Sequence, residues 1–272
     1  MKTSVPQSTC KPYFELRQVS KAFGSNTVLE RVSFAVLPGQ TICILGRSGA
    51  GKSVSLRLFM GFLKPDSGRV IAGCEDITDL SEEELDRIHK KVTMVFQSGA
   101  LFDSLSVWEN VAFPLREREN LDEEEIGRRV DRLLEMVGAI HIRDLLPSED
   151  STGLKRSVAI ARALAANPEA VLYDDEPTTM VDPIMARRLG DLIVTLKTQL
   201  KLTSLVVTHE MRLAEKLADH IIFLDRARVI FSGTVAEMER SSEPVVRNFL
   251  ELDRFDMRAL LSRKEPDYRI VA

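Results

Sequence analysis

The most chemically informative residues lie between positions 46 and 53, which read GRSGAGKS. This stretch fits the pattern G-x-x-x-x-G-K-[ST], in which curled backbone N–H groups, a lysine and a hydroxyl converge on phosphates and Mg²⁺. The pattern predicts a binding site for a nucleoside triphosphate, ATP above all, with Mg²⁺. The predicted site comprises Gly46, Arg47, Ser48, Gly49, Ala50, Gly51, Lys52 and Ser53.

The sequence on either side of this loop predicts the elements that it needs. Residues 41–45 form an apolar run typical of a buried strand, and 54–62 have the pattern of a helix. A helix that begins near Lys52 points the positive end of its dipole at the phosphates. Strand, loop and helix in this order argue against a chance glycine-rich turn.

Polar residues end three further predicted strands, as an ATPase site requires. EAVLYDDEPTT (169–179) ends in carboxylates, one to stand beside Mg²⁺ and one to polarise the attacking water. SLVVTHE (204–210) ends at His209, and the strand VTMVF is followed by Gln97. STGLKRSVAIARAL (151–164) places a small polar loop before a helix, which is a favourable seat for a phosphate.

Length and composition exclude several classes of protein. The 272 residues suit one large domain, or one domain with a subdomain, and 44% of them are hydrophobic, enough for a core. A net charge of −4 disfavours nucleic-acid binding. Three cysteines without metal-ligand spacing predict reduced thiols in a cytosolic protein. No apolar run has the roughly 18–20 residues of a membrane span, so a membrane role requires a partner.

The order of the predicted elements indicates four regions. Residues 1–12 are a flexible lead-in, 13–242 form an α/β core, 98–165 are a mainly helical part of it, and 243–272 are an appended helix. The apolar positions of that last helix are Val245, Phe249, Leu252, Phe255, Met257, Leu260 and Leu261.

Two helix starts and one helix core are predicted inside the α/β core. Ser81 with Glu84, and Asp122 with Glu125, are typical of helix N-caps. Apolar residues then recur at helical spacing over 126–137, which indicates a helix packed in a core.

Together these motifs resemble the ATP-binding-cassette (ABC) family over roughly residues 14–240. The resemblance implies a P-loop NTPase core of the ABC ATPase type with an inserted helical subdomain and a C-terminal helical extension. It implies ATP hydrolysis coupled to transport, and a head-to-tail homodimer with two ATP molecules between the Walker A loop of one copy and the signature loop of the other.

The resemblance also assigns roles to single residues. Phe23 in SKAFG matches the aromatic that stacks on adenine, although an aromatic after a strand is often part of the core. The implied catalytic residues are Glu176, His209 and Gln97. The implied Mg²⁺ residues are Ser53, Gln97 and Asp175, and further nucleotide contacts fall to Ser151, Gly153 and Asp182.

The signature segment departs from the family pattern, which is usually LSGG followed by Gln or Met. Here Asp150, Ser151, Thr152 and Gly153 precede Leu154. Thr152 brings a branched side chain, and Asp150 brings a negative charge near a phosphate seat unless Lys155 or Arg156 neutralises it. We expect lowered activity rather than none.

The carboxylate pair is the second departure, because this chain is one residue longer than the pattern between Arg162 and the acids. Counting back from Pro177 gives Asp175 beside Mg²⁺ and Glu176 as the base; counting forward from Arg162 gives Asp174 and Asp175. The first count is favoured because Glu-Pro-Thr-Thr keeps its spacing to Asp182, and a bulge can absorb the extra residue.

A finer resemblance links residues 96–117, 172–186 and 243–250 to ATPases of Mla/MCE lipid transporters. It implies a homodimer of ATPase subunits, an integral membrane permease, an MCE-domain lipid-binding protein, a small accessory cytosolic protein, and a place on the cytoplasmic face of the inner membrane. A soluble ABC ATPase of translation or DNA repair is an alternative, yet neither a second cassette nor a coiled-coil insertion is present. A weakly hydrolysing regulatory subunit is another, which the two departures keep open.

The segment after Gln97 is too apolar for one short helix to bury, which predicts an exposed groove for a helix of the membrane partner. Its large apolar residues are Leu101, Phe102, Leu105, Val107, Trp108 and Phe113.

Overall fold

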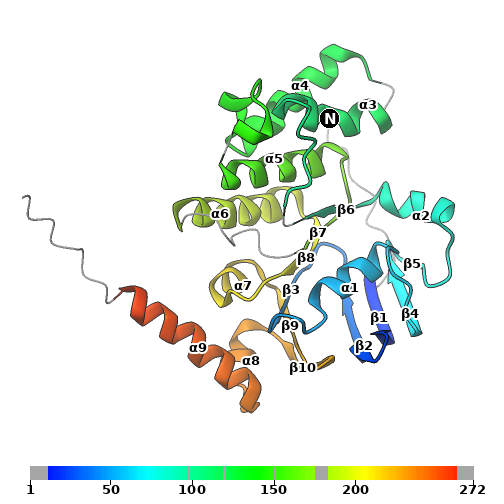
Figure 1. Cartoon of the computed structure of the whole chain (residues 1–272), viewed down its shortest axis with the longest axis vertical. Coiled ribbons are helices and arrows are strands. Elements are labelled where there is room, and N and C mark those ends of the chain that lie inside the picture. Colours follow the sequence, from blue (N-terminus) through cyan, green and yellow to red (C-terminus); the bar gives the residue numbers. More distant parts are fainter. Residues whose placement is uncertain (1–11, 97, 119–120, 150, 175–182, 262–272) are drawn as a thin grey trace, which may run out of the picture.

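Two β-sheets and the helices that cover them make up the fold, which a computed structural model defines (Figure 1). The α/β class predicted from the sequence is confirmed. The structure describes residues 12–96, 98–118, 121–149, 151–174 and 183–261.

The larger sheet has six strands in the order β10-β9-β3-β8-β7-β6. All neighbours are parallel except β10, which pairs antiparallel with β9. The carboxyl ends of the parallel strands therefore meet at one edge, where ligands bind in such sheets. The strands are β3 (Thr41–Gly46), β6 (Val92–Val95), β7 (Ala170–Tyr173), β8 (Thr203–Val207), β9 (His220–Asp225) and β10 (Arg228–Gly233).

The smaller sheet is antiparallel, in the order β2-β1-β4-β5. Its second strand begins with the exposed Asn26 and Thr27, which do not show the apolar alternation that identifies a strand. The strands are β1 (Phe14–Phe23), β2 (Asn26–Val36), β4 (Ser67–Ala72) and β5 (Glu75–Asp76).

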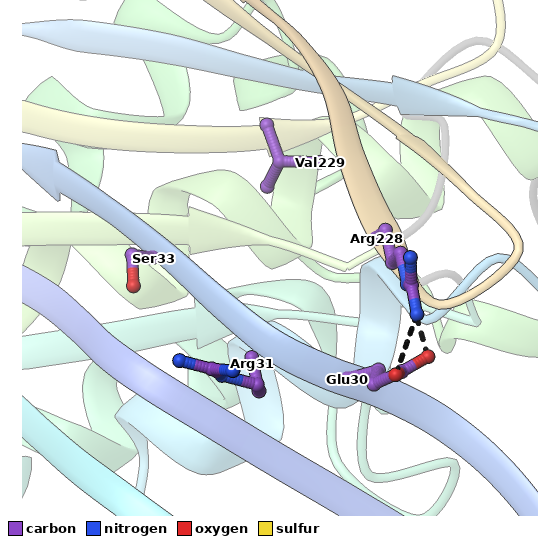
Figure 2. A pocket seen from close by; sticks show the side chains of 5 residues that line it. All are labelled: Glu30, Arg31, Ser33, Arg228 and Val229. Carbon is purple, nitrogen blue, oxygen red and sulfur yellow. Dashed lines mark hydrogen bonds and ion pairs between the residues drawn. The ribbon is translucent and has the colours of Figure 1, made fainter.

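A surface ion pair joins the two sheets (Figure 2). The Arg228 guanidinium on β10 donates to both carboxylate oxygens of Glu30 on β2, at 3.0 and 2.6 Å. The Glu30 N–H donates to the Ala227 carbonyl at 2.8 Å, so backbone and side chain hold the same junction. A depression of about 390 Å³ lies here, and Arg31, Ser33 and Val229 complete its lining.

The helices are distributed along the whole length of the molecule, with α1, α2, α6 and α7 beside the sheets in its middle part (Figure 1). At one end lie α3, α4 and α5, and at the other α9 lies beside α8. The helices are α1 (Lys52–Phe59), α2 (Glu82–His89), α3 (Val107–Arg118), α4 (Glu123–Met136), α5 (Thr152–Ala165), α6 (Pro183–Leu200), α7 (Met211–Leu217), α8 (Val235–Glu239) and α9 (Pro244–Leu261), with 3₁₀ turns at Ile140–Ile142 and Pro147–Glu149.

Both predicted helix caps are confirmed. Ser81 and Glu84 form a reciprocal capping box at α2, and the Asp122 carboxylate accepts the Glu125 N–H at the start of α4. The sequence misses α7 and α8, which are one to two turns long and give too little periodicity to detect.

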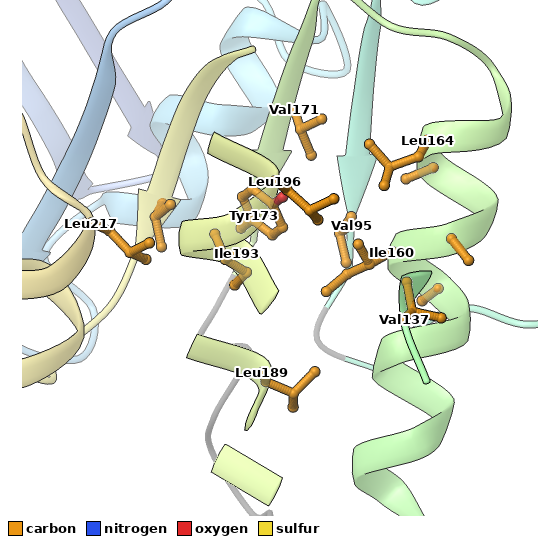
Figure 3. Close-up of a cluster of buried hydrophobic side chains, with 14 of the residues drawn as sticks. Val95, Val137, Ile160, Leu164, Val171, Tyr173, Leu189, Ile193, Leu196 and Leu217 are labelled. Carbon is orange, nitrogen blue, oxygen red and sulfur yellow. The ribbon is translucent and has the colours of Figure 1, made fainter. Parts of the chain in front are cut away.

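The parallel sheet separates two hydrophobic clusters. On β7, Val171 and Tyr173 belong to the cluster that contains α5 and α6, whereas Ala170 and Leu172 belong to the cluster that contains α1. Figure 3 shows the first of these, where Ile160 of α5 lies close to Val95 and Tyr173 of the sheet. Strict alternation along the strand thus assigns each side chain to a face.

One expectation about the cysteines needs correction. Cys43 is a free, buried thiol as expected, and burial raises its pKa to about 12, but Cys74 is disulfide-bonded through a partner outside the described residues.

The appended helix is present as α9, and two of its predicted apolar residues, Val245 and Phe249, pack against the core. Among the residues of α9 whose side chains the structure describes, Val246 and Leu250 are buried, while Leu252, which the sequence assigned to the apolar stripe, is 55% exposed. The Phe249 ring packs edge-on against Phe223 of β9, with the ring centroids 5.1 Å apart. The helix is thus docked on the end of the parallel sheet through its first two turns.

Candidate functional site

The carboxyl edge of the parallel sheet brings three predicted site segments together. The loop 46–53 follows β3, His209 follows β8, and Asp174 follows β7. Backbone bonds continue the sheet to this edge, since the Thr208 N–H donates to the Ile44 carbonyl at 3.2 Å and the Asp174 N–H to the Val95 carbonyl at 2.9 Å. With β8 between β3 and β7, the loop and Asp174 lie roughly 10 Å apart across the sheet.

Two glycines of the loop have no space for a side chain. A Cβ on Gly46 would collide with the Leu224 carbonyl of β9, and one on Gly51 would lie 2.6 Å from the Val28 carbonyl and 2.7 Å from the Leu29 Cδ2. Both glycines also have positive φ angles, 147° and 98°. Their backbone is therefore fixed against β2 and β9 in a conformation that only glycine adopts readily.

The third glycine faces open space. Gly49 has a φ of +79°, and a Cβ there would meet nothing within 4 Å. The loop is thus anchored at both ends, and the open space beside Gly49 between them leaves room for a phosphate chain against the backbone.

Lys52 and Ser53 stand where the loop enters α1. The Lys52 Nζ donates to the carbonyls of Gly46 at 2.7 Å and of Arg47 at 3.0 Å, which holds the ammonium over the loop. Gly51 is the N-cap of α1 and makes no side-chain cap, so the first amides of the helix remain for an anion. The hydroxyl of Ser53, one residue into the helix, suits Mg²⁺ that also takes phosphate and water oxygens.

Asp174 lies on the same face of the sheet as α1. It is 7% exposed and follows Tyr173 without a break in the ladder, so alternation places its side chain on the side of Ala170 and Leu172. This is the face of the loop and of Lys52. Asp175 and Glu176 lie outside the described residues, as do Gln97 and Asp182.

The predicted second phosphate seat is the start of α5. Ser151 is the N-cap, and its Oγ accepts the Leu154 N–H at 3.4 Å. Ser151 and Thr152 are exposed, whereas Gly153 is buried within the chain. Arg156 is 5% exposed and so does not share the exposed surface of the loop; of the two bases expected to offset Asp150, Lys155 is the more accessible.

Phe23 and His209 are both accessible. The Phe23 ring ends β1 with 47% exposure, and the Lys21 ammonium lies 5.6 Å from its centroid, so Phe23 is not a core residue. His209 is exposed at the bend after β8.

The segment after Gln97 is organised by a residue that the sequence analysis missed. Asn110 is fully buried; its Oδ1 accepts the Phe102 N–H at 2.8 Å, and its Nδ2 donates to the carbonyls of Phe102, Leu105 and Ser106 at 3.0 Å each. An amide beside Val107 and Val111 on the apolar face of α3 is the signal that could have identified it.

Only part of the apolar content of this segment is exposed. The rings of Phe102 and Phe113 lie 5.0 Å apart and are 43% and 41% exposed, whereas Val107 is buried and Trp108 packs partly against the core. The prediction that some of these side chains remain on the surface is confirmed, and the exposed part is an aromatic pair.

Neither a protein-built metal cluster nor a membrane span is found in the described part of the chain. No three His, Cys, Asp or Glu side chains there are placed to hold a metal ion. No helix there is long and apolar enough to cross a bilayer.

Comparison with known proteins connects this site to one family. The ABC transporter family matches residues 29–179. The methionine import ATP-binding protein MetN of Geobacillus kaustophilus is 39% identical over 241 residues, which cover 87% of this chain and 70% of MetN. The intermembrane phospholipid transport system ATP-binding protein MlaF of Escherichia coli is 36% identical over 237 residues, 87% of this chain and 88% of MlaF.

A solved structure matches as well. The dimeric post-hydrolysis state of the ATP-binding cassette MJ0796, bound to ADP and Pi, superposes with a TM-score of 0.75 at 31% identity and covers 82% of this chain and 98% of that cassette.

Replacing Lys52 with alanine is expected to abolish ATP hydrolysis and to weaken ATP binding roughly 10²–10³-fold, because an ammonium aimed at developing phosphate charge is removed. Lys64→Ala is the control, since Lys64 is exposed beyond the end of the same helix. Turnover and ATP affinity of the purified chain decide the matter; equal values for the two variants would contradict the phosphate-loop assignment.

Gly51→Ala is expected to lower mainly the stability of the fold, whereas Gly49→Ala is expected to weaken mainly ATP binding. The first collides with backbone and should lower the free energy of unfolding by about 2–5 kcal/mol. The second should cost only about 1 kcal/mol for its positive φ, yet weaken ATP binding because its methyl group enters the open space where the phosphates bind. Urea unfolding and ATP titration measure both; equal unfolding energies would contradict the close contact with β2.

Proposed function

Since the chain belongs to the ABC transporter family, it is an ATP-binding and ATP-hydrolysing transport subunit, and we propose that its cargo is a phospholipid or a similar hydrophobic molecule. Its cofactors are ATP and Mg²⁺. Subunits of this family act as dimers paired with membrane permease components.

The observation that carries the lipid assignment is the surface formed by the segment after Gln97. Residues 96–117 resemble the corresponding stretch of lipid-transport ATPases, and they present the exposed rings of Phe102 and Phe113. The similarity to a phospholipid transport subunit over 87% of this chain supports the same conclusion. An exposed aromatic pair suits an apolar helix of a permease.

We assign the site residues as follows. The loop amides and Lys52 bind the phosphates, Ser53 and one aspartate hold Mg²⁺, and Glu176 orients and deprotonates the attacking water. Bound Mg²⁺ neutralises phosphate charge. The remaining assignments are adenine stacking by Phe23, contact with the γ-phosphate by His209, sensing of Mg²⁺ by Gln97, and contacts across the dimer by Ser151, Gly153 and Asp182.

Two observations support different aspartates as the Mg²⁺ ligand. The spacing from Glu176 to Asp182 supports Asp175. The buried position of Asp174 on the α1 face supports Asp174. Mutation of each aspartate separates the two.

The proposed assembly is a homodimer on the cytoplasmic face of an inner membrane, docked to an integral permease. An MCE-domain lipid-binding protein and a small accessory cytosolic protein complete it, as the resemblance to Mla-type systems implies. The net charge of −4 is consistent with the absence of a nucleic-acid partner.

Glu176→Gln should leave ATP binding intact, lower hydrolysis roughly 10²–10⁴-fold, and trap an ATP-bound dimer, because a general base is lost. Asp174→Asn and Asp175→Asn are measured beside it for Mg²⁺-dependent ATP affinity, and the aspartate beside Mg²⁺ is the one whose loss weakens it. If Asp175→Asn traps the dimer and Glu176→Gln turns over normally, Asp175 is the base and Asp174 holds Mg²⁺.

Phe102→Asp or Leu105→Asp should break co-purification with an integral membrane protein while ATP binding persists, since a charge is placed in an apolar contact. Phe62→Asp is the matched control, because Phe62 is 52% exposed after α1, away from this segment. Mass spectrometry of the detergent-extracted complex identifies the bound molecule. Bound phospholipid supports the proposal, whereas a bound amino acid would show that the cargo is an amino acid. A wild type that never associates with membranes would favour the soluble ABC alternative.

A further inference from the structure

The segment that follows Gln97 lies flat on one face of α5. Gly99 has a φ of +75°, and a Cβ there would lie 3.4 Å from the Ala159 Cβ and 3.5 Å from the Lys155 carbonyl. Lys155, Ala159 and Arg162 are spaced by four and three residues, so they share that face. The loop and the helix are therefore in direct contact, although they are more than fifty positions apart in the sequence.

Arg162 of α5 stabilises this contact through its side chain. Its Nη2 donates to the Gly99 carbonyl at 2.8 Å, and its guanidinium carbon lies 5.7 Å from the centre of the Phe102 ring. Burial lowers the pKa of the guanidinium, and no carboxylate of the described residues pairs with it. An aliphatic side chain would fill the same space without this cost, so the charge serves the contact with the loop.

The other end of α5 is the predicted phosphate seat. Ser151 caps the helix eleven residues before Arg162, about 16 Å along a straight α-helix. Phe102, on the opposite side of Arg162, belongs to the exposed aromatic pair with Phe113. One guanidinium thus connects the partner-facing ring to the helix that begins at the phosphate seat.

We propose that Arg162 is a positioning residue that holds residues 99–102 on α5, so that movement of Phe102 by the membrane partner is passed to the N-terminus of α5. This inference rests on the proposed function for the identity of the partner, but the tie itself lies within one chain. Arg162 touches neither ATP nor the reacting water.

The first test compares ATP hydrolysis with and without the permease. Arg162→Met should leave the rate of the isolated chain unchanged and lower its stimulation by the permease about tenfold, since a hydrogen bond from a charged group is lost. Arg162→Lys should recover part of it, because the ammonium can still reach the Gly99 carbonyl but does not stack as a planar group.

Arg116→Met is the matched control. The Arg116 guanidinium also lies over a ring, 5.4 Å from the centre of Trp108, but it pairs with Glu123 and has no link to α5. Its stimulation by the permease should equal that of the wild type. Equal stimulation of Arg162→Met and the wild type, or an equal loss of the isolated rate, would overturn the proposal.

The second test needs no membrane partner. Amide exchange of the full chain is followed with and without a non-hydrolysable ATP analogue at concentrations where the dimer forms. In the wild type, nucleotide should change protection in both α5 and 99–106; in Arg162→Met the change in 99–106 should be lost while that in α5 remains. The proposal is overturned if nucleotide still changes amide protection in both α5 and 99–106 of Arg162→Met. It is also overturned if nucleotide does not change protection in 99–106 of the wild type. If this test succeeds while no permease stimulates the wild type, the tie stands and the transporter assignment fails.

Discussion

The close fit of the glycine loop between β2, β9 and α1 is the constraint on which the rest of the site depends. Gly46 and Gly51 leave no room for a Cβ against Leu224, Val28 and Leu29, so the loop can take only one path. That path places Lys52 at the first turn of α1, over the carbonyls of the loop. The parallel order of β3, β8 and β7 then brings His209 and Asp174 to the same edge. Charge and dipole converge there without any contribution from ligand binding.

In the helical part of the chain, polar side chains fix the segment between β6 and α3. The helices α3, α4 and α5 pack through the apolar cluster on one face of the sheet, but the segment that joins β6 to α3 depends on polar ties. Asn110 holds it from α3 with four hydrogen bonds, and Arg162 holds it from α5 with one. Hydrogen bonds are directional, so they fix a loop where dispersion contacts alone would let it slide. The exposed Phe102 and Phe113 are presented on this fixed segment.

Whether a feature could be predicted from the sequence depends on how far apart along the chain the interacting residues lie. The strand–loop–helix sequence around residues 46–53 and both helix caps depend on residues within a few positions of one another, and these expectations are confirmed. The polar residues at the start of β2 owe their extended conformation to pairing with β1, which a local sequence pattern does not predict. The bond of Arg162 to Gly99 spans 63 positions, so no local sequence pattern predicted it. The extra residue near Asp174 leaves two assignments of the Mg²⁺ ligand and the catalytic base open. Mutation of the individual carboxylates distinguishes them.

The most direct measurement is ATP-dependent transfer of labelled phospholipid between vesicles by the complex purified through this chain. The account predicts transfer that requires ATP and Mg²⁺, stops when Lys52 is replaced, and is not competed by small amino acids. Hydrolysis of ATP by an intact membrane complex with no movement of phospholipid, but with uptake of a small polar solute, would contradict it.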